Sequence, residues 1–132
     1  MDRLFLDANI LFSAAYRADA GLLRFWQLKD VVLCSPHYAL EEARFNVDEK
    51  AQKVRLSKLA KKLQLADAIP GLSLQASSLP EKDLPILIAA FAARATHLIT
   101  GDVRHFGQYF GKRIEGILVL PPARYLNKYS KS

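Results

Sequence analysis

Residues 4–12 read LFLDANILF and carry two polar side chains in an otherwise apolar run. The apolar residues before Asp7 predict a short buried strand, and the run from Ile10 onward begins a segment with helical spacing. A strand that passes directly into a helix leaves Asp7 and Asn9 at the junction. We therefore expect both polar side chains to lie where a strand ends, not inside a core.

The same alternation of short apolar runs and helical segments continues along the chain. It implies crossover connections, and hence an α/β fold with a mostly parallel sheet covered on both faces. One domain over residues 1–126 is expected, with a short basic tail at 127–132 that frays. Strands are predicted at 3–6, 31–34, 97–100 and 116–120 and, more weakly, at 72–74, and helices at 10–16, 21–28, 36–46, 49–66 and 84–95.

Composition narrows the classes of function. The chain has 132 residues, 51% of them hydrophobic, and a formal net charge of +6, which suits a polyanionic partner. The single Cys34 excludes an internal disulfide, and no Cys/His cluster has zinc spacing. Asp7 interrupts any signal-peptide pattern, and the longest apolar stretch is too short for a membrane span of about 20 residues. We expect a cytoplasmic protein without membrane association.

Carboxylates occupy the ends of the predicted elements. Asp7 and Asp102 each follow a predicted strand, and Asp83 precedes the most apolar helix. A fourth carboxylate comes from Glu41 or Glu42 on the helix after the second strand. Neither glutamate lies on the apolar stripe of that helix, so periodicity leaves the choice between them open.

These acidic residues have an ordinary structural interpretation and a functional one. Each aspartate is also a good helix cap, and both glutamates suit a solvated helix face. Taken together, however, four negative charges in one place repel one another unless a proton or a cation lies between them. Hard oxygen ligands favour Mg²⁺ or Mn²⁺, so the pattern predicts a metal-dependent site for phosphoryl transfer.

Four motifs carry a resemblance to a known family. The stretches 6–9 (LDAN), 42–46 (EARFN), 79–87 (LPEKDLPIL) and 98–106 (LITGDVRHF) resemble, in order and spacing, the PIN-domain nucleases, which include the VapC-like toxins. The resemblance implies a three-layer α/β/α sandwich. It favours Glu42 over Glu41, because the family's glutamate is followed by a buried residue, here Ala43, and has an apolar residue two places before it, here Leu40. It also implies catalytic and metal-binding roles for Asp7, Glu42, Asp83 and Asp102, with Asn9 and Thr100 as supporting polar groups.

The activity that the resemblance implies is metal-dependent hydrolysis of RNA phosphodiester bonds with one or two Mg²⁺ or Mn²⁺ ions. It further implies the toxin of a toxin–antitoxin pair, a homodimer, and a cognate antitoxin protein as partner. Some family members carry another Asp or Asn shortly after the last aspartate, where this chain has Val103, Arg104 and His105. The number of metal ions therefore stays open.

Basic and aromatic residues suggest how RNA would be held. Unstacked bases could rest on Tyr16 or Phe106, although core packing is the better interpretation of Phe106. The lysine-rich helix at 49–66 is either a solvated amphipathic helix or a rim that contacts phosphates. The apolar residues between 12 and 28 form either part of the core or an exposed surface for a dimer or an inhibitory partner. Candidate substrate contacts after the last aspartate are Arg104, His105, Lys112 and Arg113.

Two other functions compete with the nuclease. A haloacid-dehalogenase-like phosphatase also begins with an aspartate after its first strand, but its chemistry needs a second aspartate at position 9, where this chain has Asn9. A PIN-like fold that only binds nucleic acid or protein needs no carboxylate cluster. The four retained carboxylates argue against that binding module.

Overall fold

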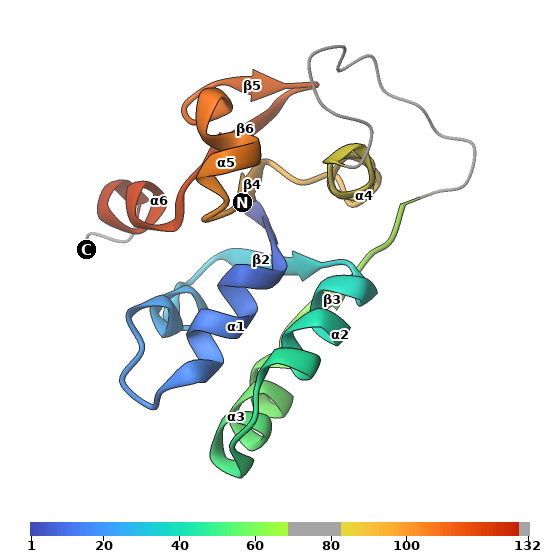
Figure 1. The fold of residues 1–132 in the computed structure, drawn as a ribbon. Helices are drawn as coiled ribbons and strands as arrows, with labels where there is room; N and C mark the ends of the chain where they lie inside the picture. The colour runs from blue at the N-terminus through green and yellow to red at the C-terminus, as the bar shows by residue number, and fades with distance from the viewer. Residues whose placement is uncertain (69–82, 130–132) are drawn as a thin grey trace.

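The structure, a computed structural model, describes residues 1–68 and 83–129, so the strand predicted at 72–74 lies outside the described residues. Its centre is a six-stranded sheet in the order β3-β2-β1-β4-β6-β5 (Figure 1). All neighbouring strands are parallel except β5 and β6, which are antiparallel. The strands are β1 (Asp2–Leu6), β2 (Val31–Ser35), β3 (Gln64–Leu65), β4 (His97–Ile99), β5 (Arg113–Ile114) and β6 (Ile117–Leu120).

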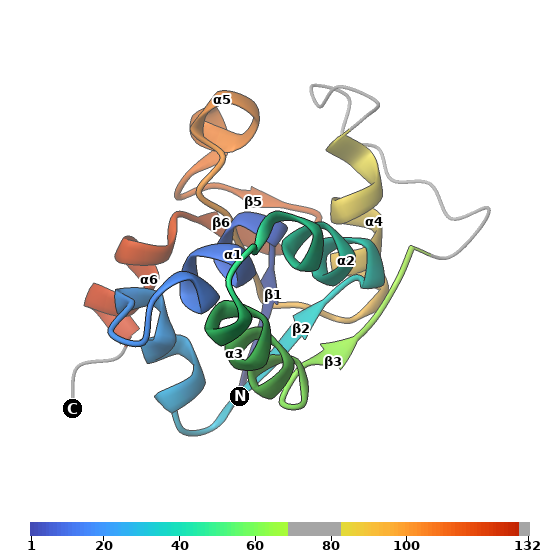
Figure 2. The ribbon, with the colours of Figure 1, turned by 60° about the horizontal axis from the view of Figure 1, so that its bottom comes forward.

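Helices cover both faces of this sheet (Figure 2). Successive side chains of a strand point to opposite faces, and in β1 this puts Leu4 and Leu6 in one core cluster and Phe5 in the other. The first cluster packs under α1 (Ala8–Tyr16), the 3-10 helix η1 (Gly21–Gln27), α2 (His37–Asn46), α3 (Lys50–Ala60) and α6 (Pro122–Tyr129). The second packs under α4 (Leu84–Ala92), α5 (Val103–Phe106) and the 3-10 helix η3 (Gly107–Tyr109). The predicted three-layer α/β fold is confirmed.

The prediction of a helix at 49–66 is wrong after Ala60. Helix α3 ends at Ala60, the chain turns, and Gln64 and Leu65 form β3. Cys34 and Ser35 of β2 pair with these two residues. Because β2 would otherwise be an edge strand with unpaired backbone groups, pairing with β3 outweighs the helical preference of the Lys- and Leu-rich sequence.

The carboxyl-terminal part also differs from the prediction. Residue 116 was expected to start a strand, but Glu115 (φ 51°) and Gly116 (φ 81°) form the two-residue turn that joins β5 to β6. Positive φ at both central positions is what a tight hairpin requires. The basic tail expected to fray from 127 is helical as far as Tyr129, because Tyr125 and Leu126 bury one face of α6 in the core.

Most of the apolar residues between 12 and 28 are core or rest on it. Phe25 is completely buried, and Phe12, Leu22, Leu23 and Trp26 pack against the first cluster while partly exposed. Tyr16 differs, because 52% of it is exposed.

In the described ranges 1–68 and 83–129, no helix has the length and apolar character needed to cross a membrane.

His97 at the start of β4 gives the fold a predicted pH dependence. It is 7% exposed, and its ring meets Tyr125 edge-on with 5.1 Å between ring centroids. Burial lowers the pKa of His97 below its ordinary value of 6.5, and Asp2 and Arg113 shift it in opposite directions. As pH falls below 6.5, the unfolded chain binds a proton that the folded chain excludes.

We therefore expect the free energy of unfolding to be highest above that pH and to fall as the solution is acidified. Urea unfolding of the wild type and of His97→Asn across this range is the measurement. The variant should be less stable throughout, and its stability should depend less steeply on pH. Equal slopes in the two proteins would contradict the assignment to His97.

Candidate active site

The carboxyl ends of β1 and β4 create the place where polar side chains collect. From β1 the chain proceeds outward through β2 to β3, and it later returns to form β4 on the other side of β1. A sheet whose strand order reverses in this way has a crevice at the carboxyl ends of the two strands, where ligands of open α/β sheets bind. Asp7 follows β1 and Asp102 follows β4, and the amide of Asp7 donates to the carbonyl of Ile99 at 3.1 Å.

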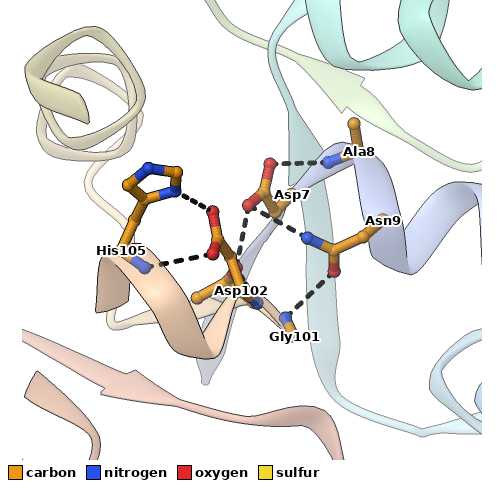
Figure 3. A network of polar contacts seen from close by, with 7 residues as sticks. Asp7, Ala8, Asn9, Gly101, Asp102 and His105 are labelled. Carbon is orange, nitrogen blue, oxygen red and sulfur yellow. Dashed lines mark hydrogen bonds and ion pairs between the residues drawn. The ribbon is translucent and has the colours of Figure 1, made fainter. Parts of the chain in front are cut away.

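Asp7 is held by three donors (Figure 3). Its Oδ1 accepts from the amide of Ala8 at 2.7 Å, which caps α1, and its Oδ2 accepts from the Thr100 hydroxyl at 2.8 Å and from Asn9 Nδ2 at 3.3 Å. Thr100 is completely buried, and its Oγ1 also accepts from the amide of Asp102 at 3.1 Å. The hydroxyl of Thr100 therefore links the two aspartates and fixes their relative positions.

Asn9 clamps the loop after β4 against the start of α1. Its Oδ1 accepts from the amide of Gly101 at 2.9 Å, as Figure 3 shows, and that amide can only donate, which fixes the orientation of the side-chain amide. A Cβ on residue 101 would lie only 3.2 Å from Asn9 Oδ1, so glycine gives the room for this approach. Both the oxygen and the nitrogen of the Asn9 side chain are therefore hydrogen-bonded. An amide cannot act as the acid/base aspartate that a haloacid-dehalogenase-like phosphatase needs at this position.

Asp102 is engaged by His105, one turn along α5. Its Oδ1 accepts from the amide of His105 at 3.1 Å, and its Oδ2 lies 2.6 Å from His105 Nδ1. Burial raises the pKa of Asp102, but the hydrogen bonds from the ring and backbone of His105 outweigh it, and the pKa lies below the ordinary value. Asp102 is thus held in its charged form and also caps α5.

The charges of the two aspartates interact. Burial raises the pKa of Asp7 most strongly, hydrogen bonds from Thr100 and Ala8 lower it, and the negative charge of Asp102 raises it again. The net direction is upward. A carboxylate whose charged form is disfavoured by burial and by a like charge gains from any cation that comes between them.

Tyr38 shows that the remaining carboxylates lie in the same region. This residue of α2 is 48% exposed, and burial of its hydroxyl raises its pKa, with further upward contributions from the charges of Asp7, Glu42 and Asp83. Three carboxylates from separate segments therefore act on one phenol. Glu41 instead pairs with Arg44 on the exposed side of α2.

Asp83 stands at the N-cap position of α4, but its side chain makes no capping hydrogen bond. Its Oδ2 is buried, and within residues 1–68 and 83–129 it has no hydrogen-bond partner. A buried carboxylate oxygen without a donor is costly, so capping does not explain this aspartate. This unpartnered oxygen is suited to a ligand that carries positive charge.

The carboxylates have the chemistry of a divalent-cation site without forming a closed shell of ligands. Over the residues that the structure describes, no three His, Cys, Asp or Glu side chains are close enough together to hold a metal ion as they stand. The carboxylates offer only oxygen ligands, the charge of Asp102 acts on Asp7, and Asp83 Oδ2 has no hydrogen-bond partner among the described residues. These properties fit Mg²⁺ or Mn²⁺, which keep several waters and need only one or two carboxylates.

The predicted substrate contacts are not all brought to this region. Arg104 is exposed on α5 beside Asp102, and His105 binds Asp102 directly. Lys112 is exposed just before β5. Arg113 pairs in register with Leu118, which pairs with His97 at the start of β4, so it lies toward the opposite end of the strands from Asp102.

Sequence reasoning missed Tyr38, although its place one turn before Glu42 was a usable signal. It also offered Phe106 as a base-stacking candidate, and that residue is only 2% exposed, which confirms core packing.

Fold and site together define a class: an α/β protein with a mostly parallel six-stranded sheet and carboxylates gathered where its strand order reverses. No protein-family model and no curated protein matches the chain.

Proposed function

We propose that this protein is a metal-dependent endoribonuclease of the PIN type that hydrolyses RNA phosphodiester bonds. The observation that carries the proposal is the placement of Asp7 and Asp102 side by side at the carboxyl ends of β1 and β4, where the buried hydroxyl of Thr100 bonds to both residues. None of Asp7, Glu42 and Asp83 forms an ion pair with a basic side chain among the described residues. Such an array favours a divalent cation and, through it, a phosphate.

The chain's own residues prepare the site. Thr100, Ala8 and Asn9 fix the orientation of the Asp7 carboxylate, and His105 fixes that of Asp102. Tyr38 keeps its proton because burial and the negative charges of Asp7, Glu42 and Asp83 raise the pKa of its hydroxyl, so this hydroxyl is a neutral hydrogen-bond donor. Asp7, Glu42, Asp83 and Asp102 would hold Mg²⁺ or Mn²⁺, and a bound ion would supply activation of water and stabilisation of the leaving oxygen.

The second candidate is a PIN-like module that binds nucleic acid or protein without cleaving it. The lack of a ready three-ligand cluster in the described part of the chain favours this alternative. The toxin role, the antitoxin partner and the homodimer stay predictions from the resemblance.

Metal dependence is the test. We expect the purified protein to cleave single-stranded RNA internally with Mg²⁺ or Mn²⁺ and to stop when EDTA is added. We also expect either ion to raise the melting temperature, since a ligand at about 100 times its Kd stabilises the folded state by about 2.7 kcal/mol. Sodium chloride at matched ionic strength controls for screening of the repelling carboxylates.

Cleavage that persists in EDTA would contradict a metal-dependent mechanism. A metal-induced rise in melting temperature without cleavage of any RNA would favour the binding module instead.

A further inference from the structure

An open groove leaves the candidate site along α1. Its inner hollow, of about 400 Å³, is bordered by Asn9, Gly101 and Asp102, and its outer hollow, of about 390 Å³, by Phe12, Tyr16 and Arg17. Ser13 and Leu22 border both hollows, so the two lie next to each other. The groove therefore has one end at the carboxylates and the other at an aromatic and cationic surface.

Helix geometry gives the groove its direction. Asn9, Ser13 and Arg17 follow one another at intervals of four residues, so they form a stripe on one side of α1 and its C-cap. At 1.5 Å per residue this stripe runs about 12 Å along the helix axis. That length exceeds the rise of about 3.4 Å per nucleotide along the axis of a stacked duplex.

The outer end has the chemistry of a base-stacking surface. Tyr16 is 52% exposed, and its ring lies 5.5 Å from that of Phe12, tilted by 51°, so the two aromatics support each other. Arg17 lies beside them, and its Nε is 3.7 Å from Asp19 Oδ1, a loose pair in which both side chains are largely exposed. The guanidinium is therefore available to a phosphate at little cost.

We propose that this groove seats the nucleotide next to the scissile phosphate of single-stranded RNA, with its base against Tyr16 and the following phosphate near Arg17. The inference rests on the proposed nuclease function for the position of the scissile bond. The outer hollow adjoins the carboxylate site and offers the exposed Tyr16 ring beside the Arg17 guanidinium, and this combination favours a nucleic-acid strand as the occupant. An aromatic ring accepts any base, so the seat adds affinity with little sequence preference.

A second hollow on the molecule provides a matched control. It is lined by Phe91 and Arg94, so it also combines an aromatic and a guanidinium, but it lies at the end of α4, just before β4 begins. Phe91 is 41% exposed. Nucleotide binding that needs only an exposed aromatic beside an arginine would depend on Phe91 as much as on Tyr16.

The test measures binding and cleavage separately. Fluorescence anisotropy of an end-labelled short single-stranded RNA in EDTA gives Kd, and cleavage of the same RNA in Mg²⁺ gives KM and kcat. We expect Tyr16→Ala to raise both Kd and KM about tenfold, the effect of losing one base–aromatic stack, and to leave kcat within about twofold. Tyr16→Phe and Phe91→Ala should match the wild type, and thermal melts confirm that each variant is folded.

The outcomes separate the two proposals. Tyr16-dependent binding without cleavage would support the nucleotide seat and overturn the nuclease. Cleavage with unchanged Kd and KM in Tyr16→Ala would keep the nuclease and overturn the seat. Equal losses in Tyr16→Ala and Phe91→Ala, or no binding of RNA by the wild type, would also overturn the seat.

Discussion

Asp7→Asn is expected to lower the rate of RNA cleavage by more than about 100-fold, because even outer-shell partners of a metal ligand cost 10–100-fold when they are removed. Asp7 stands at the centre of the candidate site, where Thr100, Ala8 and Asn9 all donate to it and Asp102 acts on its charge. The substitution removes the negative charge and keeps the size of the side chain. The rise in melting temperature with Mg²⁺ or Mn²⁺ should also shrink or disappear.

The matched control is Asp2→Asn, which makes the same change at the other end of β1. Asp2 Oδ2 accepts from the Tyr125 hydroxyl at 2.7 Å, and an asparagine oxygen can accept the same bond. This variant should cleave RNA and respond to metal like the wild type. Equal cleavage by Asp7→Asn and Asp2→Asn would remove Asp7 from the site, and a large loss in Asp2→Asn would point to a general effect on the fold.

The fold class was predictable because the signal is repeated. Four of the strands and five of the helical segments are apolar runs or amphipathic stretches that alternate along the chain, and that alternation permits few arrangements other than a parallel sheet. Residues 4–12 show this best. Leu6 ends β1, Asp7 caps α1, and both flanking apolar runs are largely buried, so the local sequence and the fold agree.

The two missed strands have different causes. Residues Gln64 and Leu65 form a strand because β2 offers its edge, and nothing in a stretch rich in Lys and Leu indicates this. Local propensity cannot anticipate that pairing, since it arises from tertiary context. Arg113 and Ile114 instead form β5 because the tight turn at Glu115 and Gly116 folds them back on their sequence neighbours in β6.

The candidate site was predictable in its residue types and less so in its arrangement. The ends of β1 and β4 could be read from the sequence, and so the juxtaposition of Asp7 and Asp102 was expected. The sequence did not predict that Tyr38 lies among the carboxylates or that an oxygen of Asp83 is buried without a partner among the described residues. Both features depend on how α2 and α4 pack beside the sheet. Two adjacent glutamates remained indistinguishable by periodicity, and here the structure gives them different surroundings.

Glu42→Gln is expected to reduce RNA cleavage by about 10–100-fold and to shrink the metal-induced rise in melting temperature. The charge of Glu42 acts on the Tyr38 hydroxyl together with those of Asp7 and Asp83, so its loss lowers the negative potential that attracts the cation. Without metal and at low salt, the same loss relieves repulsion between like charges. The metal-free variant should therefore be slightly more stable than the wild type.

Glu41→Gln separates this role from the general effect of losing one negative charge from α2. Glu41 pairs with Arg44 across an exposed turn, with half or more of each side chain accessible to solvent, and such pairs contribute about 0–1 kcal/mol. Its loss should leave cleavage and metal response unchanged and lower the metal-free stability slightly or not at all. The two neighbouring substitutions thus differ in the sign of their effect on metal-free stability and in the size of their effect on cleavage. The same loss of activity in both variants would show that net charge on α2, and not the action of the Glu42 charge at Tyr38, governs cleavage.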